Sequence, residues 1–386
     1  MPKRQKTSDE PLTSRPLPVL RAMIDAIDHD VLQQLSRRNG IVAEIARYKR
    51  EHGIQIRDLD REKELLDDRR NRAAPLGLSP EMIESMFRLI LWASRDRQAA
   101  LRAEVPLDVE PRTIAVIGGK GGMGRCLAGL FADVGHAVMI ADVDTRLSPR
   151  EAAEVADVVV ISVPIDHTVA VIEELGPRVR ADALLMDVTS TKAAPLAAML
   201  RASRASVVGT HPLFGPSVHS LQGQRIVLTP GRGDDWLAWL RGVLHARGLT
   251  MLETDGENHD RVMAVVQVLV HFATEVMGRT LATLQVPMDE TLAFTSPIYL
   301  LELLMTARHF AQSPDLYASI QMSNPRTGEV TAAYAEAVNQ LRAAVERGDR
   351  AAFADNFRDV RAFFGAFTDQ ALVQSDFLID RLVERA

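Results

Sequence analysis

Cysteine, long apolar runs and excess positive charge are scarce or missing in this sequence of 386 residues. The single cysteine, Cys126, excludes an internal disulfide and is typical of a reducing cytosol. No run of 18 or more apolar residues occurs, which argues against a membrane span. The net charge of -6, without a long basic stripe, argues against a nucleic-acid partner. We therefore expect a cytoplasmic protein that binds neither a membrane nor nucleic acid.

The spacing of apolar residues divides the first third of the chain into three parts. Residues 1–15 are polar and lack the apolar core of a signal peptide, so we expect a disordered tail. Between 16 and 103, apolar residues recur three and four apart, which predicts three helices, the last with Ser79 as its N-cap. Residues 104–112 contain two prolines and no periodicity, and are expected to be a linker.

The remaining sequence predicts two further domains. Between 113 and 255, short β-rich runs such as TIAVIG and VVVISVP alternate with helical patterns, which indicates a mostly parallel sheet of Rossmann type. From 256 to 386 only helical patterns remain, too apolar to stand alone, and we expect them to form a dimerisation domain. The expected protein is therefore multi-domain: an all-α three-helix domain, an α/β domain and an all-α C-terminal domain.

A glycine-rich loop follows the first predicted strand. Gly119, Gly121 and Gly124 form the pattern G-x-G-x-x-G between TIAVI and a helical run. Glycines let the backbone approach a pyrophosphate, and the helix N-terminus supplies N–H groups and a positive dipole end. Asp142 ends the next strand, 23 residues after Gly119, where a carboxylate would bind a ribose 2′-hydroxyl and repel a 2′-phosphate. The loop therefore predicts NAD, rather than NADP, as the cofactor.

Four polar residues downstream are candidates for a site. Ser190 and His211 each follow a predicted strand, where side chains face the ligand crevice of an open sheet. His271 and Arg308 lie in apolar helical stretches, and a buried arginine there would need an anionic partner. The spacing alone leaves an exposed surface position open for Arg308.

These segments resemble the prephenate dehydrogenase family. IGGKGGMG, DVTSTK, GTHPLFGP, NHD and SPIYLLEL occur in the order seen in that family. The resemblance implies NAD-dependent oxidative decarboxylation of prephenate to 4-hydroxyphenylpyruvate. It implies that His211 deprotonates the 4-hydroxyl while Ser190 orients His211, that Arg308 holds a substrate carboxylate, and that His271 lines the pocket.

The helical block carries polar residues at spacings that allow a shared pocket. They are Arg38, Lys49, Asp58, Arg61, Glu62, Ser94 and Gln98. Arg38 and Lys49 are 11 residues apart, so on one helix they point within about 20° of each other. Arg21 lies 17 residues before Arg38 and is rotated roughly 100° away, so it suits the pocket of a partner subunit. Ordinary solvated helix faces remain the alternative for all of them.

The same block resembles the all-helical chorismate mutase family, through LRAMIDAIDHDVLQQLSRR, VAEIARYK and IRDLDREKELL. The resemblance implies an intertwined dimer in which Arg21 visits the partner's site. It assigns the carboxylates and ether oxygen of chorismate to Arg38, Arg61 and Lys49. It assigns the substrate hydroxyl and the rest of the pocket to Asp58, Glu62, Ser94 and Gln98, with Gln98 donating to the ether oxygen. Asn39 and Gly40 depart from the family's pattern, in which a charged pair usually follows the arginine that corresponds to Arg38.

Together the two resemblances imply a bifunctional, tyrosine-forming homodimer that uses chorismate, prephenate and NAD, without a metal. Tyrosine is the expected feedback inhibitor, although no residue indicates where it binds. Three alternatives stay open: a dehydrogenase whose helical block only dimerises or regulates, arogenate as the substrate, or a non-catalytic NAD sensor.

Overall fold

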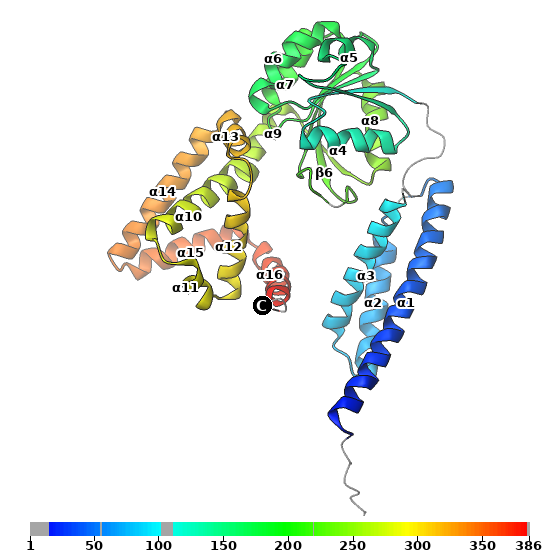
Figure 1. The fold of residues 1–386 in the computed structure, drawn as a ribbon. Helices are drawn as coiled ribbons and strands as arrows, with labels where there is room; N and C mark the ends of the chain where they lie inside the picture. Colours follow the sequence, from blue (N-terminus) through cyan, green and yellow to red (C-terminus); the bar gives the residue numbers. More distant parts are fainter. Residues whose placement is uncertain (1–14, 55, 102–110, 219, 384–386) are drawn as a thin grey trace, which may run out of the picture. The chain divides into compact units, whose positions relative to one another are not determined.

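The structure is a computed structural model that describes residues 15–54, 56–101, 111–218 and 220–383 (Figure 1). Residues 1–14 of the expected tail (1–15) lie outside the described residues. So do residues 104–110 of the expected linker (104–112). Two compact units are present: the first comprises Met1–Val109 together with the short segments Ser220–Gln222 and Ala246–Gly248, and the second comprises the rest of Glu110–Ala386. Each unit is considered by itself.

The first unit consists of three long helices, as the periodicity predicts. They are α1 (Leu17–Glu51), α2 (Leu59–Ala73) and α3 (Pro80–Ala100), with a 3-10 turn at Ala74–Leu76. The side chain of Ser79 accepts the Met82 N–H and caps α3, which confirms the expected N-cap. Asp58 caps α2 in the same way, by accepting the Arg61 N–H.

The long helix α1 exposes most of its apolar side chains. Only Val42 and Ala46 are buried among its 35 residues. Ile24, Ile27 and Leu32 keep 58%, 60% and 65% of their surface in contact with solvent. An apolar stripe of this length is unfavourable in water and is expected to be covered by another protein surface.

The second unit begins with a seven-stranded sheet in the order β2-β1-β3-β4-β5-β6-β7. Its strands are β1 (Thr113–Ile117), β2 (Ala137–Ala141), β3 (Val158–Ile161), β4 (Leu184–Asp187), β5 (Ser206–Pro212), β6 (Arg225–Arg232) and β7 (Thr250–Glu253). All neighbours pair in parallel except β5 and β6, which are antiparallel. The mostly parallel sheet is thus confirmed. The apolar runs do not reveal β7, because this short edge strand is largely exposed.

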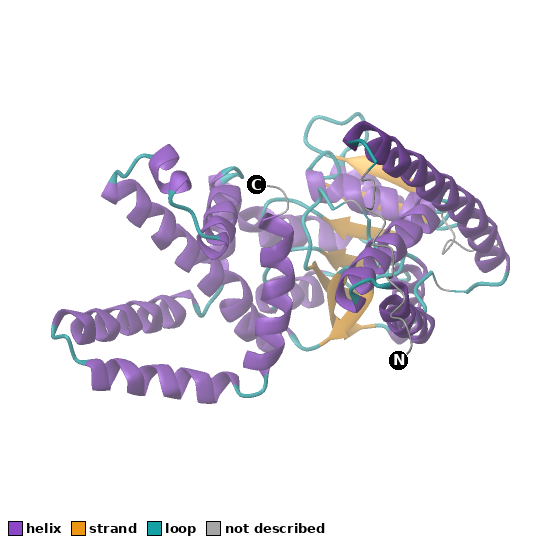
Figure 2. Ribbon diagram, turned by 90° about the horizontal axis from the view of Figure 1, so that it is seen from below, coloured by secondary structure: helices purple, strands orange, loops and turns teal. Residues whose placement is uncertain are grey.

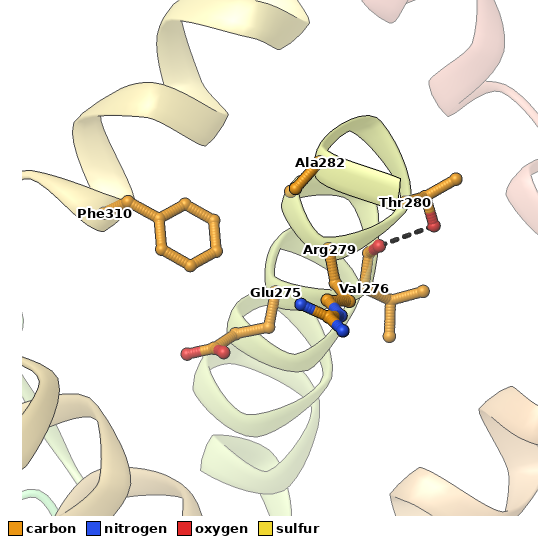
Figure 3. A pocket seen from close by; sticks show the side chains of 7 residues that line it. Glu275, Val276, Arg279, Thr280, Ala282 and Phe310 are labelled. Atoms are coloured by element: carbon orange, nitrogen blue, oxygen red, sulfur yellow. Dashed lines mark hydrogen bonds between the residues drawn. The ribbon is translucent and has the colours of Figure 1, made fainter. Parts of the chain in front are cut away.

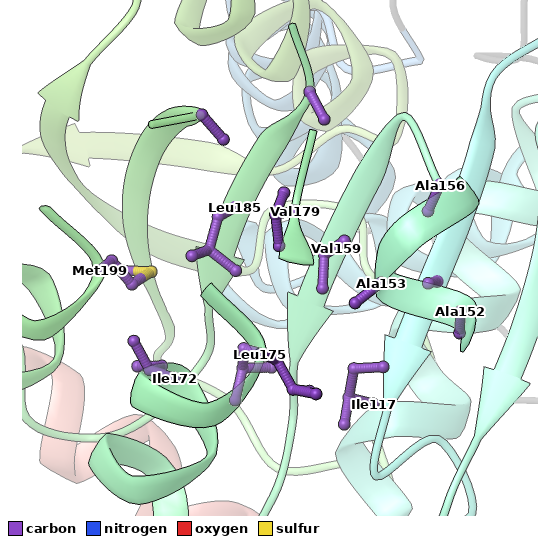
Figure 4. Close-up of a cluster of buried hydrophobic side chains, with 14 of the residues drawn as sticks. Ile117, Ala152, Ala153, Ala156, Val159, Ile172, Leu175, Val179, Leu185 and Met199 are labelled. Carbon is purple, nitrogen blue, oxygen red and sulfur yellow. The ribbon is translucent and has the colours of Figure 1, made fainter. Parts of the chain in front are cut away.

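Helices cover the sheet and form its core. They are α4 (Gly122–Asp133), α5 (Pro149–Val155), α6 (Ile165–Leu175), α7 (Ala193–Ala202) and α8 (Asp234–Ala246). On one face, Ile172 and Leu175 of α6 and Met199 of α7 join strand residues such as Val159 and Leu185 (Figure 4). Strands buried on both faces explain the continuous apolar runs in the sequence.

From residue 256 onward the described chain is helical throughout, as expected (Figure 2). The helices are α9 (Gly256–Met263), α10 (Val270–Leu284), α11 (Met288–Ala293), α12 (Pro297–Phe310), α13 (Pro314–Ser323), α14 (Thr327–Glu346), α15 (Arg350–Phe364) and α16 (Phe367–Val383). A π-helical segment, Ala264–Leu269, joins α9 to α10. Such segments often occur at functional sites.

The continuous helical run Gly256–Leu284 is long and apolar enough to cross a membrane, judged by length and composition alone. Core helices of water-soluble proteins pass the same test. Here the run contains His259 and Asp260, which are buried and hydrogen-bonded within the unit.

Gly40 offers a test of helix propensity in α1. A Cβ at Gly40 would meet nothing within 4 Å, so Gly40→Ala should stabilise the first unit by about 0.5–1 kcal/mol. Thermal unfolding followed by circular dichroism measures the gain. Gly77→Ala is the control, because Gly77 has a φ of 73° and alanine should be strained there. A lower melting temperature for Gly40→Ala would contradict this prediction and would mean that another surface packs at Gly40.

Candidate active sites

The glycine-rich loop between β1 and α4 has the geometry of a dinucleotide site. Gly118 has a φ of 77°, and a Cβ at Gly124 would lie 2.5 Å from the Gly118 carbonyl oxygen, so only glycine fits. Asp142 follows β2, and its carboxylate accepts the Lys120 N–H at 3.1 Å, which draws it to the loop. Lys120 itself pairs with Asp144 at 2.8 Å. The loop amides and the Asp142 carboxylate match a pyrophosphate and a ribose.

His211 lies near the end of β5 and is 3% exposed. Its Nδ1 is 2.9 Å from Nε2 of His259 on α9, and its Nε2 is 3.3 Å from the amide nitrogen of Gln267. Burial, followed by the proximity of His259 and Lys192, lowers the pKa of His211 well below its usual value. The ring is therefore neutral near pH 7 and has one nitrogen free to accept a proton.

A buried charge network surrounds this histidine. The Asp260 carboxylate lies 2.8 Å from Nδ1 of His259. It also accepts the backbone N–H groups of Lys192 and Ala193, at 2.7 and 3.0 Å. Lys192, which is fully buried, pairs with Asp187 and donates to the Thr210 carbonyl at 2.8 Å. Burial lowers the pKa of Lys192, against the raising effect of Asp187. The network joins the ends of β4 and β5 and the start of α7 to α9.

Ser190 is expected to orient His211, but within the described residues it forms no hydrogen bond, and both ring nitrogens of His211 have other neighbours. The partners of His211 come from the C-terminal domain instead. The signal for them is the NHD motif together with Gln267, four residues before His271, which marked the resemblance without suggesting a role for each residue.

His271 belongs to an aromatic cluster of the C-terminal domain. His271 lies one turn beyond Gln267, and its ring centroid is 5.6 Å from that of His309 and 4.8 Å from that of Tyr317. The Nδ1 of His271 is buried without a hydrogen-bond partner within the described chain. Arg308, next to His309 on α12, is exposed. Arg308 thus takes the exposed position that the spacing left open, so no buried anionic partner is required for it within one chain.

A neighbouring cavity of about 630 Å³ lies between α10 and α12 (Figure 3). Its lining includes Glu275, Arg279 and Phe310 and none of the predicted site residues. The Phe310 ring requires glycine opposite it, because a Cβ at Gly278 would lie 2.1 Å from its edge.

In the first unit, the structure brings Arg38, Ser94 and Gln98 together. Arg38 on α1 donates to the Ser94 hydroxyl of α3, and Ser94 donates to the Ile90 carbonyl at 2.6 Å. Burial, then the nearby Arg69, lowers the pKa of Arg38. Gln98 is 8% exposed; its amide nitrogen donates to the Ser94 carbonyl at 3.3 Å, and its Oε1 lacks a partner in the described chain.

Lys49 lies near Asp58 and Glu62, two further residues of the predicted pocket. Its ammonium donates to the Ile56 carbonyl at 2.7 Å. Burial lowers the pKa of Lys49, whereas the carboxylates of Asp58 and Glu62 raise it. Glu62 also pairs with Arg95 at 2.6 Å, a residue that the spacing did not single out. Asp58 is the N-cap of α2 rather than a residue within the helix, because its carboxylate holds the Arg61 N–H.

Arg61 and Arg21 point away from this cluster in the single chain. The Arg61 side chain is 65% exposed and pairs with Glu64 at 2.5 Å. Arg21 is exposed on the uncovered stretch of α1. One chain therefore assembles only part of the cationic pocket.

Comparison with known proteins covers most of the chain. Family models match for chorismate mutase type II at residues 20–99, for the prephenate dehydrogenase nucleotide-binding domain at 132–252, and for the prephenate dehydrogenase dimerization domain at 255–359. The T-protein of Enterobacter agglomerans is 36% identical over 94% of this chain and 97% of its own length. The T-protein of Haemophilus influenzae is 32% identical over 94% of this chain and 96% of its own.

A solved structure supports the fold of the second unit. Prephenate dehydrogenase from A. aeolicus, solved with hydroxyphenyl propionate and NAD+, aligns with a TM-score of 0.54 at 18% identity. The alignment covers 66% of this chain and 98% of that one. With both catalytic domains matched and relatives similar along nearly their whole length, the chain belongs to the T-protein family and is a bifunctional chorismate mutase and prephenate dehydrogenase that uses NAD.

Proposed function

We propose that the two reactions use separate sets of side chains, one in each unit. The mutase domain spans 16–103, and the dehydrogenase comprises a Rossmann domain at 113–255 and a helical domain at 256–386. The observation that carries this assignment is that each unit gathers its own polar cluster, around Arg38 and Lys49 in the first and around His211 in the second.

In the mutase, the side chains act by position and charge rather than as nucleophiles. The rearrangement of chorismate to prephenate places negative charge on the breaking ether oxygen. Lys49 and the Gln98 amide are the donors to that oxygen, and Arg38, Arg61 and the partner's arginine at position 21 hold the two carboxylates. Such a cage selects the compact conformer and stabilises the charge as it grows.

Completion of this cage requires a second copy of the chain. Arg21 lies on the uncovered apolar stretch of α1, far around the helix from Arg38. An intertwined homodimer covers that stretch and places each Arg21 in the partner's pocket. The dimerization-domain match at 255–359 supports self-association of the second unit as well.

In the dehydrogenase, His211 acts as the base. Its Nε2 accepts the proton of the substrate's 4-hydroxyl group while a hydride leaves carbon 4, so that the hydroxyl oxygen becomes a carbonyl oxygen. Loss of the ring carboxylate as CO₂ returns an electron pair to the ring, the oxygen regains a proton, and a phenol results. NAD, when bound along the glycine loop and Asp142, supplies the hydride acceptor.

Residues of the C-terminal domain beyond Gln267 are the candidates for binding the substrate carboxylates. Arg308 would hold one carboxylate, and His271 would line the pocket, with its buried Nδ1 available to a ligand. Ser190 remains a candidate for contact with substrate at the end of β4. We further infer a cytoplasmic location and inhibition by tyrosine, which shares the phenol of the product.

Lys49→Ala should abolish mutase activity and leave the dehydrogenase intact. Removal of an ammonium aimed at the developing charge is expected to cost about 10²–10³ in turnover. Separate assays with chorismate and with prephenate plus NAD measure the two activities. Retention of mutase turnover would remove Lys49 from the mechanism.

Mixing Arg21→Ala and Lys49→Ala chains should restore mutase activity that neither variant has alone. A mixed dimer contains one complete site, from the intact Lys49 of one chain and the intact Arg21 of the other. Random pairing predicts about a quarter of wild-type activity. If Arg21 serves its own chain's pocket, co-refolded mixtures will stay inactive.

His211→Asn should lower dehydrogenase turnover by about 10²–10⁴-fold, because a positioned general base is lost. NAD binding, followed by titration, should be unchanged, since the glycine loop is untouched. Turnover close to that of the wild type would show that another group takes the proton.

Asp142 should make the enzyme favour NAD over NADP by at least about tenfold in kcat/KM, since its carboxylate repels a 2′-phosphate. Asp142→Asn, which keeps a hydrogen-bonding side chain without the charge, should reduce that ratio. Initial rates with both cofactors give the result, and equal use of the two by the wild type would contradict the assignment.

A further inference from the structure

The orientation of the base depends on which of its ring nitrogens carries the proton. His211 can accept a hydroxyl proton at Nε2 only if its own hydrogen is on Nδ1. That nitrogen faces His259 Nε2 at 2.9 Å. The hydrogen-bonding state of His259 therefore decides which form of His211 is present.

Asp260 determines the state of His259. Both of its carboxylate oxygens accept backbone N–H groups at the start of α7, Lys192 at 2.7 Å and Ala193 at 3.0 Å. Although burial by itself would raise the pKa of Asp260, hydrogen bonds from His259 and these amides bring it below its usual value. An ionised carboxylate can only accept, so His259 carries its hydrogen on Nδ1, which is 2.8 Å from Asp260 Oδ1.

The consequences pass along the chain of contacts. In the neutral form of His259, whose hydrogen is on Nδ1, the Nε2 atom is bare and accepts the Nδ1–H of His211. The Nε2 of His211 then carries a lone pair. The amide nitrogen of Gln267, which can only donate, approaches that atom at 3.3 Å.

We propose that His259 and Asp260 are positioning residues that hold His211 in the tautomer able to accept the substrate's hydroxyl proton. The role rests on the proposed function of His211 as the base. His259 and Asp260 touch neither substrate nor cofactor in this scheme and act through His211 alone. Lys192 is also charged and lies near the pair, but its ammonium is paired with Asp187 and donates to the Thr210 carbonyl.

Two nearly isosteric substitutions separate this role from simple packing. His259→Gln keeps an oxygen that can accept the Nδ1–H of His211, whereas His259→Met keeps the volume without a comparable acceptor. The methionine variant should lose about 10- to 100-fold in kcat with little change in the KM for prephenate, as expected for loss of an orienting partner. The glutamine variant should recover most of that loss. Equal activities of the two variants, or a methionine variant as active as wild type, would overturn the proposal.

The pH profile separates an effect on the tautomer of His211 from an effect on its pKa. The ratio of the two neutral tautomers does not depend on pH, so the loss in the methionine variant should persist on the high-pH plateau. If the substitution only changed the pKa of His211, raising the pH would restore the rate, and this would contradict the proposal. NADH titration checks that each variant retains its dinucleotide site.

Nitrogen NMR of the wild-type enzyme, labelled at histidine, tests the tautomer directly even if a variant fails to fold. Nδ1 of His211 should be protonated and Nε2 unprotonated at neutral pH, and the reverse would overturn the proposal. His211→Asn distinguishes the two levels of inference. If it retains turnover, the base assignment itself fails; if it loses turnover while His259→Met does not, only the positioning role fails.

Discussion

The carboxylate of Asp260 is the point on which the dehydrogenase unit depends. It lies on α9, in the C-terminal domain, yet it accepts two backbone N–H groups at the start of α7, in the Rossmann domain. Its neighbour His259 contacts His211 of β5. A buried carboxylate is costly unless it is fully hydrogen-bonded. The two domains therefore supply each other's partners, and the site exists only where they meet.

The mutase unit solves the problem of building a charged site differently. Its three helices bury few side chains, and the pocket around Arg38 and Lys49 lacks the cations that Arg21 and Arg61 would add. We propose one explanation for the apolar stripe of α1 and the exposed position of Arg21, namely a second chain that covers the helix and receives Arg21 in its pocket. On this proposal, catalysis and assembly are a single requirement in this unit.

Much of the architecture could be predicted because it is encoded locally. Helix periods, the Ser79 cap and the glycine loop each involve residues close in sequence, and all are found as expected. The two matched families also followed from short motifs in a fixed order. By contrast, the apolar runs do not reveal β7, because an exposed edge strand carries little apolar signal. Spacing alone also could not say whether α2 reaches back to Asp58, which in the structure is its N-cap.

The sequence by itself determined the order of domains, the cofactor loop and the choice of His211 as a candidate site residue, since these depend on contiguous residues and their spacing. Only the tertiary structure decided what holds His211. Ser190 is near it in the motif order, but His259, 48 residues beyond His211, and Gln267, 56 beyond, are its neighbours in space. Contacts of this range arise from the packing of α9 and the π-helical segment against the sheet, and no local pattern of residue types records which side chains that packing brings together.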